Sequence, residues 1–463
     1  MPTRDDRQSA VVRSGADGLA ALSAGLARAL AEQNESSNLV FSPLSIYTAL
    51  ALLAAGARGE TLAEILRVLG ARSRGELDEF VARAAVDALR DRSGSGGPRV
   101  AFACGVWSDL SCPLKPGFLE AVVDGAYRAE ASTVDFRGDP KEACRRINAW
   151  AARATNGLIE NVLSPALVDP LTRVVLGNAV YFKGKWDQAF DKSDTENALF
   201  RRLGGAGPID VPFMQSWKSQ FIAVHDGFKV LKLRYKMVDA FLTRDPKKPA
   251  PFFPRRAPLI NPDERTCAAP PPLDDSSNRS PSTTASSNNN GSSNGSQNFT
   301  SNSTQFSMCV FLPDADDGLH SLVDAIASRP SFLHQHLPRR KVDVRDFRVP
   351  RFNLSFHHSV VDILKKLGLQ LPFSPAADLS GMAEEGRLLV NKVIHKAVIE
   401  VNEEGTEAAA VTIHLMQPTA PARPPPPPPR VDFVADHPFA YFIVEEETGA
   451  IVFAGHVLDP SRE

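Results

Sequence analysis

Helix-type and strand-type hydrophobic patterns occupy different parts of this chain, and this separation limits the folds that it can adopt. The stretch from Ser42 to Leu69 starts with Ser-Pro, a common helix start, and is apolar on most faces until Gly56 and Gly59 interrupt it. It predicts a buried helix followed by a second, amphipathic one. Strand patterns dominate after Val174. Helices that come mostly first and strands that come mostly later predict an α+β fold rather than alternating βαβ units.

The strand region contains one segment that is apolar on both faces. It is VVLGNAVYFKGKW, which starts at Val174 and predicts a central strand of a sheet that is covered on both sides. RFNLSF at 351–356 instead places its apolar side chains on one face. The end of the chain, FAYFIVEEETGAIVFAGHV, is typical of two strands joined by a Glu-Thr-Gly turn. Further strand patterns lie at 227–235 and 306–312.

A polar, low-complexity stretch interrupts the strand region. Residues 245–305 open with a proline-rich segment and continue as a Ser/Asn-rich run, a composition that cannot bury enough apolar surface to fold. Loop closure costs about 0.6 kcal/mol per doubling of loop length, so a connection lengthened by about three doublings costs roughly 2 kcal/mol. We therefore expect a polar tail, 1–15, and one domain, 16–463, that carries 245–305 as a disordered insert. The sequence leaves open whether the mature protein keeps this insert.

Charge and hydropathy argue against several kinds of partner. The formal net charge is −2, so the chain has no basic field to attract nucleic acid or anionic lipid. The first apolar run is broken by Ser23, Gly25 and Arg28 and predicts neither a signal peptide nor a membrane span. We expect a monomer in the cytoplasm or nucleocytoplasm, with non-classical release to the extracellular space as the alternative.

The cysteines and the usual catalytic motifs give no sign of an enzyme. The five cysteines are odd in number and lack the spacing of a zinc site or of a disulfide framework. We expect reduced thiols at Cys104, Cys112, Cys144, Cys267 and Cys309. The sequence contains no His-Glu-X-X-His motif and no phosphate-binding loop. It predicts neither a hydrolytic enzyme nor a metal or cofactor.

Five segments together are typical of one family. They are NLVFSPLSI at 38–46, NAVYFKGKW at 178–186, VPRFNLSF at 349–356, VIHKAVIEVNEEGTEAAA at 393–410 and DHPFAYFIV at 436–444. In their order and spacing they resemble the serpin family over roughly residues 16–460 outside the insert, and VDFVADHPF at 431–439 resembles plant serpins. The resemblance implies an α+β serpin fold of three β-sheets and about nine helices, with an exposed reactive-centre loop at 403–430.

The resemblance also implies a mechanism, in which a protease cleaves the loop and the freed loop enters the main sheet as an extra strand. The hinge of that movement is Glu403, Glu404, Gly405, Thr406, Glu407, Ala408, Ala409, Ala410, Val411 and Thr412. A strand that enters a packed sheet buries alternate side chains, and Thr406, Ala408, Ala410 and Thr412 are small. Alanine also favours helices, so a helical or flexible segment is the alternative, and the preceding EVNEEG favours the hinge.

Five further residues match family positions where the sheet must open. Ser42, Ser45, Asn178 and His395 match the polar cluster below the centre of the main sheet, and Trp186 matches the aromatic residue at the point where the loop first enters. A lone histidine or tryptophan is usually a core residue. A role in the core and a role in sheet opening are compatible at these positions.

The part of the reactive-centre loop that a protease would cleave, here called the bait segment (Thr419 to Arg430), does not identify a target protease. Family spacing from Gly405 places the reactive bond at Thr419–Ala420, where threonine suits a small-pocket protease better than a trypsin-like one. Arg423 is the nearby basic alternative, but Pro424 follows it. Leu415 or Met416 could be the residue that a chymotrypsin-like or cysteine protease recognises only if the loop acts in a shorter form than is usual for the family.

A run of six prolines, 424–429, predicts a stiff polyproline II rod, which we interpret as a spacer rather than a docking motif. The leading function is inhibition of a serine protease, or of a cysteine protease. The alternative is a non-inhibitory serpin that acts as a binding protein.

Overall fold

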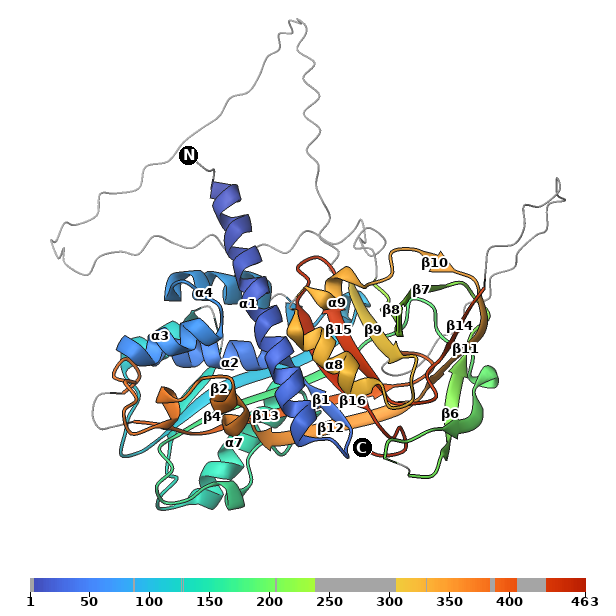
Figure 1. Ribbon diagram of the computed structural model, residues 1–463. Coiled ribbons are helices and arrows are strands. Elements are labelled where there is room, and N and C mark those ends of the chain that lie inside the picture. Colours follow the sequence, from blue (N-terminus) through green and yellow to red (C-terminus); the bar gives the residue numbers. More distant parts are fainter. Residues whose placement is uncertain are drawn as a thin grey trace, which may run out of the picture. The chain divides into compact units, whose positions relative to one another are not determined.

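The computed structural model describes residues 4–85, 88–125, 127, 129–204, 206–237, 305–329, 331–383, 388–405 and 430–463 (Figure 1). Residue contacts divide the chain into Met1–Asp239 with Thr304–Glu463, and Ala240–Ser303. All elements below belong to the first of these units. The expected insert lies outside the described residues except for Gln305, and so do the hinge from Thr406 onward and the bond Thr419–Ala420.

The described residues contain nine α-helices. They are α1 (Arg4–Gln33), α2 (Pro43–Gly56), α3 (Gly59–Val68), α4 (Arg74–Phe80), α6 (Pro116–Leu119), α7 (Pro140–Ala154), α8 (Leu319–Ser328), α9 (Phe332–Gln335) and α10 (Val361–Lys366). Short π turns continue α4 and α6, at η1 (Val81–Ala85) and η3 (Glu120–Asp124). Four 3₁₀ turns lie at η2 (Ser93–Ser95), η4 (Pro165–Leu167), η5 (Lys192–Asp194) and η6 (Leu371–Phe373). The start of α1 at Arg4 places the expected boundary between residues 15 and 16 inside this helix.

Helix α2 is buried along its whole length, as its apolar composition predicts. The Ser42 hydroxyl caps its first turn by accepting a hydrogen bond from the Ser45 N–H, and Pro43 occupies the first helical position, where its missing N–H costs nothing. The helix ends at Gly56, and α3 begins at Gly59. The two glycines therefore separate the two helices, as expected from the sequence.

The largest element of functional interest is a five-stranded sheet, here called the main sheet. Its strand order is β12 (Phe352–Ser359), β13 (Val390–Val401), β4 (Val174–Lys183), β2 (Arg99–Asp109) and β3 (Glu130–Val134). The pairs β13–β4 and β2–β3 are parallel, and the other two are antiparallel. Strand β4 lies in the middle and is buried at every residue except Lys183. The predicted central strand is confirmed.

Two further sheets complete the strand structure. A seven-stranded sheet has the order β1 (Leu39–Phe41), β16 (Ile451–Val457), β15 (Phe439–Glu445), β9 (Phe306–Pro313), β8 (Phe228–Arg234), β7 (Gln220–His225) and β10 (Lys341–Val342). A four-stranded sheet has the order β14 (Val431–Val434), β11 (Val344–Pro350), β6 (Ile209–Gln215) and β5 (Glu196–Phe200). Strands β15 and β16 form the C-terminal hairpin predicted from the sequence.

Both faces of the main sheet are covered, which explains why β4 is apolar on both sides. On one face α2 lies between the main sheet and β16 of the seven-stranded sheet (Figure 1). On the other face α7 packs over β2 and closes a second hydrophobic cluster, in which the rings of Trp107 and Trp150 meet edge to face at 4.8 Å. Three sheets with nine helices in the described part of the chain confirm the expected α+β architecture.

Four cysteines lie among the described residues, and all four are buried free thiols, as expected: Cys104, Cys112, Cys144 and Cys309. Burial raises the pKa of the Cys104 and Cys309 thiols to about 12, which keeps them protonated and unreactive at neutral pH. Cys267 lies outside the described residues.

Candidate functional site

The candidate site extends along the line where β13 and β4 meet, here called the split. These strands pair in parallel from Val393 opposite Leu176 to Ile399 opposite Phe182, and His395 lies opposite Asn178. Beyond Val401, β13 runs directly into the first residues of the expected hinge. A loop that follows β13 therefore starts beside the split.

The structure brings Ser42, Ser45, Asn178 and His395 together beneath the middle of the split. We call them the sheet-opening cluster, after the role that the sequence predicts for them. All four are fully buried. The Ser42 N–H donates to His395 Nε2 at 2.9 Å, and the Ser45 hydroxyl donates to Asn178 Oδ1 at 3.0 Å. Because Nε2 accepts, we assign the ring proton to His395 Nδ1, which then donates to Asn178 Oδ1. The cluster links α2 to the two strands that flank the split.

The electrostatics of the cluster favour a neutral histidine. Burial lowers the pKa of His395 to about 3, because the surrounding interior cannot solvate an imidazolium. Among the described residues, Asn178 Nδ2 has no hydrogen-bond partner. A buried donor left without a partner costs about 1–3 kcal/mol. The closed main sheet therefore carries a buried, unsatisfied hydrogen-bond donor at its centre.

Trp186 holds the start of the predicted hinge at the end of the split. Its side chain is buried, and its indole ring stacks on Tyr235 with ring centroids 4.6 Å apart. Its Nε1–H donates to the carbonyl of Asn402, and its main-chain N–H donates to the carbonyl of Glu404, both at 2.9 Å. The residue expected where the loop first enters thus contacts the segment from which the loop departs.

Gly405 occupies a backbone position that excludes a side chain. Its φ of +127° lies in a region that L residues rarely adopt, and a Cβ there would lie 2.1 Å from the carbonyl oxygen of Gly184. Asn402 and Gly405 exchange main-chain hydrogen bonds of 2.8 and 3.2 Å, which reverse the chain. Gly405 also pairs with Lys185 beside the end of β4. The hinge therefore begins in a tight turn against the split.

Three residues that the sequence did not indicate anchor the two hinge glutamates. Glu403 is buried, and its Oε1 accepts from the Thr195 hydroxyl at 2.8 Å and lies 3.5 Å from Nη1 of Arg351. Glu404 forms an ion pair of 2.5 Å with Lys192, and this hydrogen bond with its opposite charge raises the pKa of the Lys192 ammonium. Their sequence context is that of ordinary surface residues, so only the folded arrangement reveals them.

The same region is hollowed. A cavity of about 430 Å³ is lined by Lys192, Thr195, Arg351, Asn402, Glu403 and Glu404. It therefore lies directly beside the turn at which the hinge begins. In the described part of the chain, no group of three or more His, Cys, Asp or Glu side chains could hold a metal ion. No helix there is long and apolar enough to cross a membrane.

Comparison with known proteins identifies the class to which this fold and site belong. The family model described as serpin (serine protease inhibitor) matches residues 17–244 and 296–460. The chain belongs to the serpin family.

Its relatives place it among plant serpins of the Z type. It is 48% identical to serpin-Z8 and 44% identical to Serpin-Z2A, both of Oryza sativa subsp. japonica. The first alignment covers 97% of each chain, and the second covers 96% of this chain and 97% of the relative. These relatives are named as serpins, not as enzymes.

A solved structure supports the same assignment. It is titled as Arabidopsis AtSerpin1 in a native stressed conformation. It aligns with a TM-score of 0.77 and 34% identity, over 97% of this chain and 99% of that one.

Proposed function

We propose that this chain inhibits a serine protease as a suicide substrate, with a cysteine protease as the alternative target, and that it acts as a monomer. The observation that carries the proposal is the parallel pairing of β13 with β4, next to a hinge that turns back at Gly405. A segment that entered the split after this turn would run antiparallel to both strands. One parallel pair would be replaced by two antiparallel pairs, which are slightly more stable per residue.

The reaction starts at the bait bond, which we place at Thr419–Ala420. The protease serine Oγ attacks the carbonyl carbon of Thr419, and the peptide bond to Ala420 breaks. The nitrogen of Ala420 takes up a proton and leaves as a new amine, while Thr419 remains joined to the protease as an ester. Insertion of 406–412 into the split then carries the protease along and distorts its active site before water hydrolyses the ester.

The sheet-opening cluster resists the separation of β4 from β13. The bond from Ser42 reaches β13 through His395, and the bond from Ser45 reaches β4 through Asn178. Both strands are thereby tied to α2, and their separation requires these contacts to rearrange. The similarity to AtSerpin1, titled as a native stressed conformation, supports the view that this five-stranded sheet is the metastable state before insertion.

The decisive experiment is incubation of the purified chain with a panel of serine and cysteine proteases. An inhibitor gives a covalent complex that survives SDS, at the combined mass of the protease and the cleaved chain. Mass spectrometry of the released C-terminal peptide identifies the reactive bond. Cleavage of the loop by every protease that attacks it, without any such complex, would contradict inhibition.

Two variants sharpen this experiment. Thr406→Arg should convert the inhibitor into a substrate, because its charge would have to enter the packed sheet. Glu407→Arg places the same arginine one residue further, where the side chain of the inserted strand points outward, and should still form the complex. Equal loss of complex in both variants would contradict alternate burial of the hinge.

A non-inhibitory binding function is the second candidate, and the bait segment favours it. Pro424 follows the nearby basic residue Arg423, and a run of six prolines continues to Pro429. Most serine proteases cut poorly before proline. A binding protein of this kind would be cut or ignored by the whole panel.

A further inference from the structure

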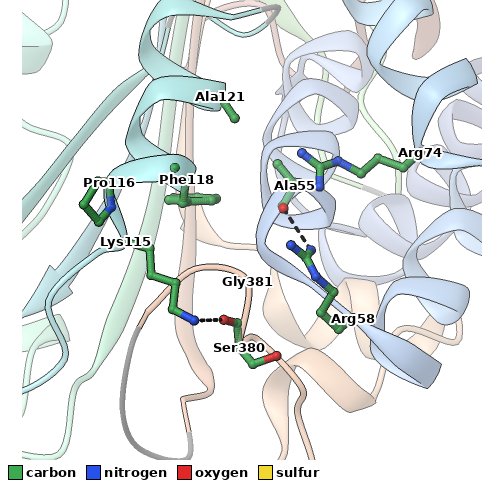
Figure 2. A pocket seen from close by; sticks show the side chains of 10 residues that line it. Ala55, Arg58, Arg74, Lys115, Pro116, Phe118, Ala121, Ser380 and Gly381 are labelled. Carbon is green, nitrogen blue, oxygen red and sulfur yellow. Dashed lines mark hydrogen bonds between the residues drawn. The ribbon is translucent and has the colours of Figure 1, made fainter. Parts of the chain in front are cut away.

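A second cavity lies apart from the hinge, against the segment that precedes β13 in the chain. Its volume is about 550 Å³, within the range of roughly 300–1,000 Å³ that is typical of small-molecule sites. Its walls come from the end of α2, Arg58 just before α3, the start of α4, the start of α6, and the loop at Ser380–Gly381 (Figure 2). Phe118, which is buried, contributes an apolar surface.

The charged side chains that line this cavity all have the same sign. Three of its lining residues are cationic, namely Arg58, Arg74 and Lys115, and none of its described lining residues is Asp or Glu. Figure 2 shows Arg58 and Arg74 on one side of the cavity and Lys115 on the other. Residues 384–387 lie outside the described residues. The cavity therefore presents positive charge from three separate elements.

Two of these cations are bonded to neutral carbonyls. Arg58 Nη1 donates to the carbonyls of Ala55 and Ala57 at 3.3 and 2.7 Å, and Lys115 Nζ donates to the carbonyl of Ser380 at 2.8 Å. A guanidinium has five N–H donors and an ammonium has three. Both groups thus keep donors for a further partner, although the nearby Asp378 carboxylate partly compensates the charge of Arg58 through an electrostatic interaction.

The third cation is only partly compensated. Arg74 Nε lies 3.6 Å from Asp78 Oδ2, too far for a hydrogen bond, and this buried nitrogen has no hydrogen-bond partner among the described residues.

The loop that faces Arg58 leaves room for its side chain. A Cβ on Gly381 would lie 2.5 Å from the Arg58 guanidinium, so glycine at this position lets the guanidinium lie close against the loop.

A purely structural role explains part of this arrangement. A cation at the C-terminal end of α2 interacts favourably with the helix dipole, and Lys115 fastens the loop at Ser380. Neither role explains why three like charges line one cavity, because like charges repel. A bound anion would relieve that repulsion, and guanidinium groups bind tetrahedral oxyanions through paired, charge-assisted hydrogen bonds.

We propose that this cavity binds a small molecule that carries two or more phosphate or sulfate groups. Arg58 and Arg74 hold one group and Lys115 holds another across the cavity, while Phe118 contacts the apolar part of the ligand. This site does not depend on the proposed inhibition, since it involves neither the hinge nor the bait bond.

The test is isothermal titration of the intact, full-length chain at constant ionic strength. Tripolyphosphate supplies clustered phosphates, a highly sulfated disaccharide supplies clustered sulfates, and sodium chloride serves as the reference salt. We expect saturable binding at one site for at least one probe, and the probe that binds more tightly identifies the natural chemistry. Heats no larger than those of the reference salt with both probes would overturn the proposal.

Single-charge variants locate the site. Arg74→Gln and Lys115→Gln should each raise the Kd about tenfold, the usual effect of losing one charge-assisted hydrogen bond. Lys141→Gln, at an exposed position of α7, removes the same charge elsewhere and should leave the Kd unchanged. Equal weakening in all three variants would show nonspecific attraction and overturn the assignment. The melting temperature of each variant shows whether it remains folded.

Discussion

At the residue scale, the clearest functional constraint is the backbone at Gly405. Alanine there would have to adopt a φ near +127° and approach the Gly184 carbonyl, so Gly405→Ala should destabilise the uncleaved chain by about 1–3 kcal/mol. Thermal unfolding measures this loss. Gly75→Ala is the matched control, because α4 leaves open space there and alanine favours a helix, so its stability should rise slightly. Equal effects in the two variants would contradict a strained turn at the hinge.

The buried histidine of the sheet-opening cluster predicts a pH dependence of stability. The unfolded chain binds a proton at this position below the ordinary pKa of 6.5, whereas the folded chain resists it down to about pH 3. The free energy of unfolding should therefore fall as pH decreases through this window, by about 1 kcal/mol per pH unit for this histidine. Burial also lowers the pKa of His456, to about 4, which adds a loss of the same sign.

Denaturant unfolding between pH 7 and pH 5 checks the contribution of His395. His395→Gln should give a shallower pH dependence than the unmodified chain, although its stability at pH 7 is lower. Ser355→Ala, at an exposed position of β12 that carries no titratable group, should keep the original slope. An unchanged slope in His395→Gln would mean that this histidine does not exclude the proton.

Sequence reasoning located some site residues and missed others for a physical reason. The four cluster residues lie in segments that resemble a known family, and the fold brings them into hydrogen-bonding contact. Lys192 and Arg351 lie far from the hinge in sequence and resemble other exposed cations. Their contacts with Glu404 and Glu403 arise only when the four-stranded sheet and η5 pack beside the end of β13.

At the element scale, the strand pattern predicted β4 well because a strand covered on both faces must be apolar on both. The same pattern could not predict that β13 is its parallel neighbour, because pairing depends on contacts between residues more than two hundred positions apart. Helix α1 was not predicted, and its first turns fall in the stretch expected to be a polar tail. Those turns are polar, so hydrophobic periodicity gives no helix signal there.

The end of β13 is the element whose anchoring should control release of the hinge. Trp186→Phe retains a ring to stack on Tyr235 but removes the donor to the Asn402 carbonyl, which should cost about 1 kcal/mol. This loss should appear in the melting temperature of the uncleaved chain and be smaller in the loop-cleaved chain, where the hinge has left this contact. Trp217→Phe, at a side chain that is 67% exposed, should change neither value. Equal losses in both forms would indicate a purely structural tryptophan.

At the scale of the whole molecule, the split and the cationic cavity involve the same moving parts. Lys115 follows β2, which pairs with β4, whereas Ser380 and Gly381 precede β13. In the closed sheet these walls are tied together by the bond from the Lys115 N–H to the Met382 carbonyl, at 2.8 Å. Separation of β4 from β13 must displace one wall relative to the other. A ligand held between Arg58 and Lys115 should therefore bind the closed sheet more tightly than the expanded one.

Loop cleavage tests both ideas with one preparation. Insertion of the freed hinge should raise the melting temperature sharply, and the cleaved chain should bind tripolyphosphate about tenfold more weakly than the intact chain. By linkage, the same ligand would then oppose insertion by an equal factor. An unchanged melting temperature after cleavage would contradict the insertion mechanism and leave the binding site standing. A raised melting temperature with an unchanged Kd would instead show that the cavity binds its ligand independently of the split.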